Sequence, residues 1–310
     1  MRQGTRIPTR ARPWVPAMLA IVLSALLCDS AEALRQLTSH PGAAVNPDWS
    51  PDGSQIAFVR WEPGSAENAL YLVDASGGTP LPVPLPEALR TSWPAWSPNG
   101  EYIAATTSLD EDHNAIQVIV VSDGARWGLV GGGREYRSPT WSPDGGWIAF
   151  DRYYNHASEI AVVPSIGGRP EWILSDASFP AWSPDSTMIA FIRSWNIWLA
   201  SPTGEDQRQL TTLSGVRGPL SWSPNSRYIA FDSDHSGNQD IWMVPISGGE
   251  PTQLTTYPGW DADPTWSPRG DEIAFSSSRA GKSGLDIWAL EVPPTPTEST
   301  SWGKLKTLLR

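Results

Sequence analysis

Short apolar runs separated by polar turns recur along the chain from about residue 35 onward. In one example, Gln55-Ile56-Ala57-Phe58 follows a Ser-Pro-Asp-Gly turn, and Leu70-Tyr71-Leu72-Val73 follows a polar loop. Short apolar runs bounded by Gly, Pro, Asp and Ser are typical of β-strands. The hydrophobic pattern therefore predicts a protein made of many short strands.

The strands belong to a unit that is repeated six times. The copies are NPDWSPDGSQIAF (46–58), WPAWSPNGEYIAA (93–105), SPTWSPDGGWIAF (138–150), FPAWSPDSTMIAF (179–191), PLSWSPNSRYIAF (219–231) and DPTWSPRGDEIAF (263–275). Their tryptophans lie 40 to 47 residues apart, at Trp49, Trp96, Trp141, Trp182, Trp222 and Trp266. This spacing is that of one propeller blade per repeat. We therefore expect an all-β fold, a six-bladed β-propeller of four-stranded antiparallel blades.

Each blade is expected to contain strands A to D, lettered from the central channel outward. Strand A ends at the repeated Trp, the SPDG turn leads into strand B, and runs such as Ile197-Trp198-Leu199 and Thr252-Gln253-Leu254-Thr255 form strands C and D. In the turn, Pro fixes φ and Asp bonds to its own backbone. We interpret the six repeated tryptophans as packing between neighbouring blades, because each buried aromatic side chain removes roughly 150–250 Å² from water.

Two segments compete to supply strand D of blade six and so close the ring. Arg35-Gln36-Leu37-Thr38 resembles the strand D sequence Arg208-Gln209-Leu210-Thr211, and Leu37 lies twelve residues before Trp49 as Leu254 does before Trp266. The strand at 35–38 is thus in register to leave no open edge, and 293–303 is then a linker or tail. The alternative is the segment 304–308, which follows that Pro-rich stretch.

The series WSPDG, IAF, IW, GG and QLT resembles the TolB-type, WD40-like propeller repeat over about residues 35 to 310. Such repeats also occur in the non-catalytic propellers of some peptidases. The resemblance implies a propeller that binds a protein partner in the bacterial periplasm, as TolB does in the Tol-Pal envelope system. Because the repeats follow the N-terminal segment directly, we expect no counterpart of the α/β domain that precedes the propeller in TolB.

Composition agrees with this fold class and excludes one class of partner. The chain contains 18 Trp, 30 Pro and 27 Gly, which suits short strands joined by many turns. Its formal net charge is −11. An acidic surface repels phosphate backbones, so we expect no nucleic-acid partner.

The first 33 residues (1–33) are interpreted as a signal peptide, which leaves 34–310 as the propeller. A basic stretch ending at Arg12 precedes an apolar run from Ala17 to Leu27, and Ala31-Glu32-Ala33 matches a cleavage site. That run is too short to span a bilayer. We expect cleavage after Ala33, no transmembrane segment in the product, and a periplasmic or secreted location. The alternative is a lipoprotein anchored through Cys28.

Strand direction sorts the loops onto two faces of the ring. The SPDG turns and the C-to-D turns lie on one face and repeat closely, whereas the B-to-C loops and D-to-A connections lie on the other face and vary. Loop diversity makes this second face, here called the variable face, the predicted binding face. Its candidate partner-binding residues on the D-to-A connections are Trp93, Tyr136, Arg137, Asp176, Arg217, Trp260, Asp261 and Asp263. The B-to-C loops add Trp61, Tyr153, Tyr154 and Asp234.

The sequence shows no catalytic motif of the GxSxG, HExxH or phosphate-loop kind. His113, His156 and His235 fall in equivalent loops of different blades, too far apart to share a metal ion. We therefore expect no catalytic residues, no metal and no cofactor. Trp, Tyr and Arg dominate protein-binding hot spots, which favours a non-catalytic binding or scaffold propeller that recognises a protein or peptide, with carbohydrate as a second ligand class. The alternative is a polysaccharide lyase or hydrolase using Asp261 and Asp263 at the channel mouth.

Overall fold

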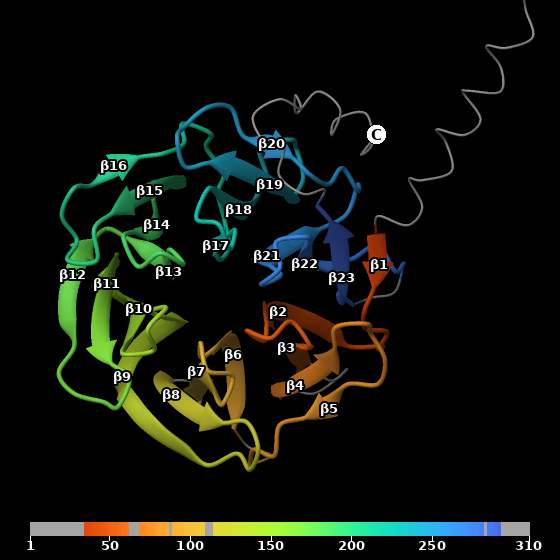
Figure 1. Cartoon of the computed structure of the whole chain (residues 1–310), viewed down its shortest axis with the longest axis horizontal. Coiled ribbons are helices and arrows are strands. Elements are labelled where there is room, and N and C mark those ends of the chain that lie inside the picture. Colours follow the sequence, from red (N-terminus) through yellow and green to blue (C-terminus); the bar gives the residue numbers. More distant parts are fainter. Residues whose placement is uncertain (1–33, 62–67, 87–88, 109–113, 282–283, 293–310) are drawn as a thin grey trace, which may run out of the picture. The chain divides into compact units, whose positions relative to one another are not determined.

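The computed structural model describes residues 34–61, 68–86, 89–108, 114–281 and 284–292. All regular secondary structure within these ranges is β-strand. Six four-stranded antiparallel blades stand around a central channel (Figure 1), which confirms the predicted fold class. The predicted signal peptide and the segment 304–308 lie outside the described residues.

The strands are assigned to blades in chain order, from the channel outward. Blades one to three contain β2 (Ala43–Trp49), β3 (Gln55–Trp61), β4 (Asn68–Asp74) and β5 (Leu81–Pro82); β6 (Arg90–Trp96), β7 (Tyr102–Ser108), β8 (Asn114–Val120) and β9 (Arg126–Trp141); and the second half of β9, β10 (Trp147–Tyr154), β11 (Ala157–Pro164) and β12 (Glu171–Ser175). Blades four to six contain β13 (Ser178–Trp182), β14 (Ile189–Arg193), β15 (Asn196–Ala200) and β16 (Arg208–Gln209); β17 (Ser221–Trp222), β18 (Tyr228–Ser233), β19 (Asp240–Pro245) and β20 (Thr252–Gln253); and β21 (Asp261–Trp266), β22 (Glu272–Ser277), β23 (Asp286–Glu291) and β1 (Leu34–Gln36).

Blades two and three share one 16-residue strand, β9, so that their strands form a single seven-stranded sheet. The first part of β9 pairs with β8 as strand D of blade two, and the last part pairs with β10 as strand A of blade three. Gly131-Gly132-Gly133 lies where the pairing of β9 with β8 shifts register, between Val130 and Arg134, and Gly132 has a φ of 101°. A left-handed glycine lets the strand turn from one blade to the next without breaking the hydrogen-bonded ladder.

Strand β1 lies at the outer edge of blade six and pairs antiparallel with β23, Leu34 opposite Leu290 and Gln36 opposite Trp288. The segment continues this contact beyond the strand, because Leu37 is buried and its N–H donates to the Ile287 carbonyl at 2.8 Å. The first described strand and the last blade are therefore joined edge to edge.

The core lies within and between the blades, and the repeated Ile-Ala-Phe of strand B forms much of it. Five of the largest fully buried side chains are the phenylalanines at this position, Phe58, Phe150, Phe191, Phe231 and Phe275. The repeated tryptophans lie where one blade meets the preceding one. Trp222, for example, shares a cluster with Ala181 and Ile197 of blade four, and its indole N–H donates to the Ala181 carbonyl at 3.0 Å.

The SPDG turns are fixed by a repeated set of hydrogen bonds. In blade one, Ser50 Oγ donates to Asp52 Oδ1 at 2.6 Å and accepts from the N–H of Gln55 at 2.9 Å. Blade six has Arg269 where the motif has Asp, and there Asp271 accepts the bond from Ser267 Oγ at 2.7 Å instead. The uniform turns therefore serve the fold itself.

Candidate functional site

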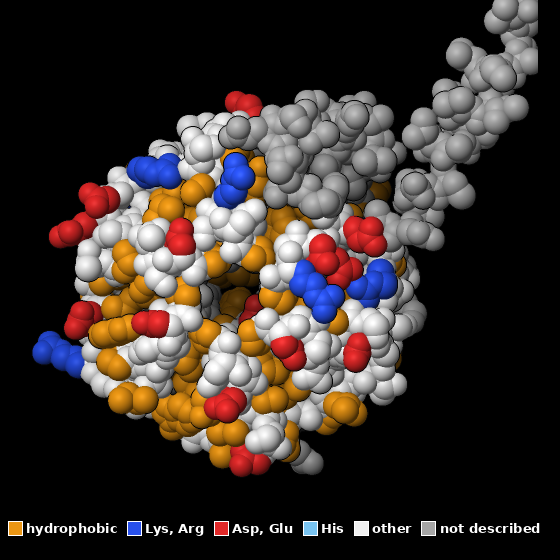
Figure 2. Space-filling view, in the orientation of Figure 1, with side chains coloured by type: hydrophobic (Ala, Val, Ile, Leu, Met, Phe, Trp, Pro, Cys, Tyr) orange, Lys and Arg blue, Asp and Glu red, His pale blue; other side chains and the backbone are white. Residues whose placement is uncertain are grey.

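The centre of the variable face is the mouth of the channel, where each blade contributes an X-Pro pair that lies in strand A or, in blade five, just before it. These pairs are Asn46-Pro47, Trp93-Pro94, Ser138-Pro139, Phe179-Pro180, Gly218-Pro219 and Asp263-Pro264. Residues of all six blades line a channel cavity of about 110 Å³, and Figure 2 shows the opening at the centre of the ring. The repeated prolines are visible in the sequence, but their convergence on one ring was not predicted.

Five of the six residues before these prolines have left-handed backbone conformations. Their φ angles lie between 47° and 54°, for Asn46, Trp93, Ser138, Phe179 and Asp263. A positive φ is unfavourable for bulky residues such as Trp and Phe, and the residue before Pro prefers an extended conformation. Strained residues cluster at ligand sites more often than elsewhere. The strain therefore marks the channel mouth as the first candidate site.

The side chains of this ring differ chemically from one side to the other. Trp93 and Phe179 meet edge to face with ring centroids 6.4 Å apart, although they come from blades two and four. Asp263 lies on the other side, where its carboxylate accepts from the N–H of Asn46 at 3.2 Å and from Ser276 Oγ at 3.1 Å. The mouth therefore has an aromatic side and an acidic side.

Buried carboxylates join neighbouring blades around the channel. Asp48 of blade one accepts from the N–H of Trp96 in blade two at 2.7 Å and from Thr265 Oγ1 in blade six at 3.2 Å. Asp151 of blade three accepts from the N–H of Phe179 in blade four at 3.3 Å. Each therefore satisfies a backbone N–H of the innermost strand of a neighbouring blade.

Burial changes the ionisation of these groups. It raises the pKa of Asp48 to about 7 and that of Asp151 to about 6. Burial, together with the nearby charge of Asp263, also raises the pKa of Asp232 to about 7. Burial likewise raises the pKa of Asp263. Several carboxyl groups around the channel therefore bind protons in the folded protein at pH values where they would be ionised in the unfolded chain.

This arrangement predicts that stability falls as the pH rises from about 4 to 7. A carboxyl whose pKa is raised on folding favours the folded state below its unfolded pKa of 3.8, and that contribution is lost as the pH passes through the folded pKa. Asp232→Asn should flatten the decline, with an effect on the order of 1–4 kcal/mol. Urea denaturation at several pH values measures it.

The matched control for this experiment is Asp52→Asn. Asp52 lies in an SPDG turn, where the hydrogen bond from Ser50 lowers the pKa of its carboxyl, and two other blades carry Asn at this position. This variant should keep the decline of the parent. Stability that increased steadily from pH 5 to pH 8 would contradict the prediction.

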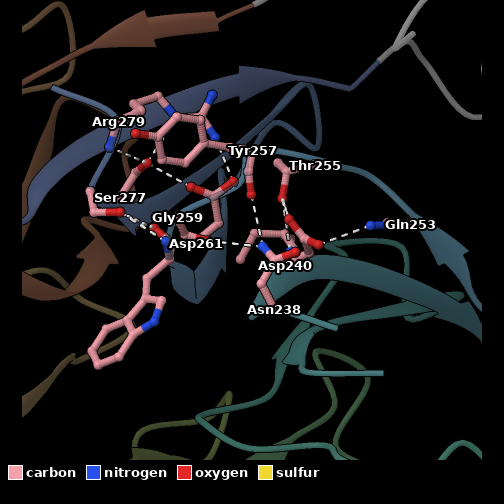
Figure 3. A network of polar contacts seen from close by, with 12 residues as sticks. Asn238, Asp240, Gln253, Thr255, Tyr257, Gly259, Asp261, Ser277 and Arg279 are labelled. Carbon is pink, nitrogen blue, oxygen red and sulfur yellow. Dashed lines mark hydrogen bonds and ion pairs between the residues drawn. The ribbon is translucent and has the colours of Figure 1, made fainter. Parts of the chain in front are cut away.

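Asp261, predicted as a binding residue, lies in a buried polar network at the junction of blades five and six. Figure 3 shows its carboxylate directed toward Ser277 and Arg279. Ser277 Oγ donates to it at 2.6 Å, Arg279 forms an ion pair with it, and the side chain of Asp261 is fully buried. The Arg279 guanidinium also lies over the Tyr257 ring. The side-chain contacts of Asp261 thus lie within blade six, and its backbone N–H donates to the Gln239 carbonyl of blade five at 3.0 Å.

The same network fixes the loop that carries Trp260. Asn238 donates to the carbonyls of Tyr257 and Gly259 at 2.8 and 2.9 Å. Asp240 beside it accepts from Gln253 at 2.9 Å, and burial raises the pKa of its carboxyl. The connection between blades five and six is therefore rigidly tied to its neighbours.

Trp260 projects from this fixed backbone. Its N–H donates to Ser278 Oγ at 2.8 Å and its carbonyl accepts from the N–H of Ser278 at 2.9 Å, while 63% of the residue is exposed. A Cβ on Gly259 would lie 2.3 Å from Ser278 Oγ, so only glycine fits before the tryptophan. A large aromatic surface held on a fixed backbone loses little entropy when it binds.

Arg217 lies near a second exposed tryptophan that the sequence did not single out. Trp195 is 57% exposed at the tip of the hairpin between β14 and β15, where Ser194 and Trp195 both have positive φ. Arg193 pairs with Asn196, so the loop is a two-residue turn of type I′ geometry, which favours Asn and Gly. The Arg217 guanidinium stacks 4.8 Å from the Trp195 ring and pairs with Asp234. The signal in the sequence was a Trp at a position where tight turns favour Gly.

Three other residues predicted from the sequence, Tyr136, Arg137 and Asp176, are not in contact with Trp195, Arg217 or Trp260. Tyr136 is 9% exposed and packs edge to face on Phe150, so it belongs to the core. Arg137 pairs with Glu135 and lies over the Tyr153 ring. Asp176 is exposed, has a φ of 49°, and accepts from Arg193 through its carbonyl.

Blades one to three hold a cleft of about 660 Å³ beside the channel mouth on the variable face. Trp61, Trp93 and Arg137 line it, together with Arg90 and a series of Thr, Ser and Asn side chains. Of these residues only the aromatic ones and Arg137 were expected from the sequence. The others lie within strands, where polar residues gave no distinctive signal.

Two further observations concern metals and membranes. No three His, Cys, Asp or Glu side chains of the described residues are grouped as a metal site requires. Nor does the described part of the chain contain a helix that is long and apolar enough to cross a bilayer.

The fold and the site define a six-bladed propeller with one uniform face and one variable face rich in aromatic side chains. The chain belongs to the TolB β-propeller family, because the model of the TolB beta propeller domain matches residues 26–179 and 169–303. The family prediction made from the repeats is confirmed.

The curated relatives match only part of the chain. An uncharacterized peptidase, YuxL of Bacillus subtilis, is 27% identical over 147 residues, which are 34% of this chain and 21% of the peptidase. The uncharacterized protein Atu1656 of Agrobacterium fabrum is 29% identical over 128 residues, 41% of this chain and 42% of that protein. The chain thus spans about a fifth of the length of the first relative and about two fifths of the second.

Solved structures resemble the propeller more fully. TolB from Acinetobacter baumannii superposes with a TM-score of 0.66 at 20% identity, covering 74% of this chain and 59% of that one. A putative TolB from Agrobacterium tumefaciens gives a TM-score of 0.63 at 18% identity, covering 84% and 97%. At this level of identity the likeness shows the fold alone.

Proposed function

We propose that this protein is an exported, non-catalytic binding propeller that captures a protein or peptide on its variable face. The family supports a binding or scaffold role. Export rests on the signal-like sequence of residues 1–33 and would place the propeller in the periplasm or outside the cell.

The observation that carries the proposal is the distribution of exposed aromatic side chains. Nine large hydrophobic side chains of the described residues are exposed, and five of these lie on the variable face. All five are aromatic: Trp61, Tyr153, Tyr154, Trp195 and Trp260. Single exposed hydrophobic residues are ordinary, but aromatic residues gathered with Arg on one face are typical of protein-binding surfaces.

The part of this face on blades four to six suits a protein partner best. Trp195 and Trp260 are its most exposed aromatic side chains, and Arg217 is stacked and ion-paired beside the first. Each tryptophan is held by a short or well-bonded loop. We assign Trp195, Arg217 and Trp260 as the anchors of the interface.

The test is capture of partners from an envelope extract by the parent and by variants of these anchors. Trp260→Ala combined with Arg217→Ala should reduce capture at least about tenfold, since each hot-spot residue contributes roughly 1–2 kcal/mol or more. Trp195→Gly should also reduce capture, yet raise the thermal midpoint, because Gly relieves the positive φ.

The control is Trp147→Ala, which removes an exposed tryptophan at the start of strand B on the opposite face. This variant should capture as the parent does. Capture that survives the anchor substitutions, or that is lost equally with the control, would refute the assignment of the face.

A further inference from the structure

A groove between blades two and three lies on the face opposite the variable face. Its volume of about 480 Å³ is within the range of about 300–1,000 Å³ found for small-ligand sites. The SPNG turn of blade two, the SPDG turn of blade three and the C-to-D turn of blade three line it, together with side chains of β7 and β9. Tyr102, which lines the groove, is the first residue of β7, whereas the undescribed segment nearest to it in the sequence follows the last residue of that strand, Ser108.

Three aromatic rings line this groove, here called the aromatic groove. Tyr102 and Trp127 meet nearly at right angles, with an interplanar angle of 77° and ring centroids 5.5 Å apart. Trp141, the repeated Trp of blade three, is the third. Both indole N–H groups are already bonded, to the carbonyls of Ser165 at 3.2 Å and of Ala95 at 3.0 Å. The rings are therefore held in place and offer a ligand their π surfaces instead of polar donors.

The corresponding groove between blades six and one has a charged lining instead. Arg35 occupies the position of Trp127, since each is a strand D residue whose side-chain N–H donates to the C-to-D turn of the next blade. Glu272 occupies the position of Tyr102, the residue before the repeated Ile of strand B. Arg35 and Glu272 form an ion pair at 2.7 Å. The aromatic groove therefore has an aromatic pair at two positions where an equivalent groove of the same ring has opposite charges.

One ionised carboxylate completes the lining. Asp144, in the turn of blade three, is the one charged residue among the described residues that line the aromatic groove. Hydrogen bonds from Ser142 Oγ and from the N–H of Gly146 lower the pKa of its carboxyl, so it is negatively charged at neutral pH. Ile166 at the rim is 87% exposed and adds apolar surface. Electron-rich ring faces beside a carboxylate attract a cation, and the apolar rim suits a cation that carries alkyl groups.

We propose that the aromatic groove binds a small organic cation with an alkylated ammonium group. The faces of Tyr102, Trp127 and Trp141 contact the ammonium group, and the carboxylate of Asp144 balances its charge. Alkylation spreads the charge over C–H groups that can contact the rings, and it leaves no N–H donor unsatisfied. This inference does not depend on the protein partner proposed for the variable face, because the two sets of residues do not overlap.

The test is calorimetric titration of the folded propeller with choline and with its uncharged analogue, in which a carbon atom replaces the nitrogen. Choline should bind at least about tenfold more tightly, because cation–π contacts and the attraction to Asp144 both require the positive charge. Asp144→Asn should weaken choline binding by about two- to fivefold and leave the analogue unchanged. Blades two and five carry Asn at this position, so the variant keeps the turn.

A double variant, Trp127→Arg with Tyr102→Glu, transfers the ion pair of blade six to the aromatic groove. Its affinity for choline should fall at least about tenfold. Circular dichroism should show the parent fold, because Arg keeps a side-chain donor for the Ser165 carbonyl as Arg35 does for Ala75. Trp127→Phe, a smaller change, should weaken choline binding severalfold, since Trp is the best of the three aromatic side chains for cations.

The control variant is Trp147→Ala, which removes an exposed tryptophan of the same face that does not line the aromatic groove. It should bind choline as the parent does. Because a trimethylammonium group occurs in free compounds and in lipid headgroups, flotation with phosphatidylcholine vesicles separates the two sources. Co-flotation that is lost in the Trp127→Phe protein would identify a headgroup, and choline binding without co-flotation would identify a free compound.

Three results would overturn the cation proposal: no binding of choline, equal affinity for the uncharged analogue, or unchanged affinity in the double variant. None of them bears on the protein-binding face, because partner capture is measured with the Trp260, Arg217 and Trp195 variants. Conversely, failure of partner capture leaves the titration unaffected.

Discussion

A propeller that begins at His40 instead of Leu34 is expected to lose about 4 kcal/mol or more of its free energy of unfolding. The truncation removes β1 and exposes the edge of β23. It also removes the buried side chain of Leu37 and the hydroxyl of Thr38, which bonds Asp286 at 3.1 Å and the N–H of Ile287 at 2.9 Å. The loss of a buried Leu side chain alone costs about 2–5 kcal/mol. Urea denaturation followed by circular dichroism measures the change.

The control is a chain that ends at Gly303 and so lacks the rival segment 304–308. It should unfold at nearly the same urea concentration as the parent. Leu37→Ala, which keeps the backbone of the closing segment, should lose part of the stability of the full truncation. A larger loss from the C-terminal truncation than from the N-terminal one would mean that the C-terminal segment closes the ring.

Trp222→Ala is expected to cost about 3–5 kcal/mol. The indole is 7% exposed within a cluster that blades four and five build together, and its N–H bonds the Ala181 carbonyl. Removing it leaves a cavity between two blades and a carbonyl without its donor. Trp182 occupies the same position in blade four but is only partly buried, so Trp182→Ala should cost less.

Equilibrium unfolding of both variants tests this difference. Trp222→Phe should fall between the parent and Trp222→Ala, because it keeps most of the buried area but loses the indole N–H. If Trp222→Ala unfolded at the same midpoint as the parent, the repeated tryptophan would have no part in packing the blades together.

The sequence predicted the blades well because each is built from local interactions. The Ser-Pro-Asp-Gly turn, the Ile-Ala-Phe strand and the repeated Trp recur within a few residues of one another. The interactions that form strands A and B and the turn between them are therefore local to each copy. Even the irregular turn of blade six follows this rule, since Asp271 compensates for Arg269 two residues away. The register of the segment around Leu37 was also visible in the sequence. In the other repeats strand D lies at a similar distance before the next repeated Trp, and Leu37 lies at that distance before Trp49.

The candidate site was less predictable, because it depends on the direction of side chains and on contacts between distant blades. Tyr136 and Asp261 lie on D-to-A connections, whose varied sequences predicted a binding face. Both side chains are nevertheless buried, since Tyr136 packs on Phe150 and Asp261 pairs with Arg279. Trp195 was missed because its loop is very short, and Arg90 because polar residues within a strand look ordinary.

The sequence by itself determined the all-β class, the number of blades and the face on which variation is concentrated, since these follow from repeat number and strand direction. Only the tertiary structure decided which side chains meet at the channel mouth. Trp93 and Phe179 touch because left-handed bends before proline turn them toward a common axis. Closure of the ring brings six separate segments to that axis. Contacts between side chains of different segments therefore cannot be predicted from any short stretch of sequence.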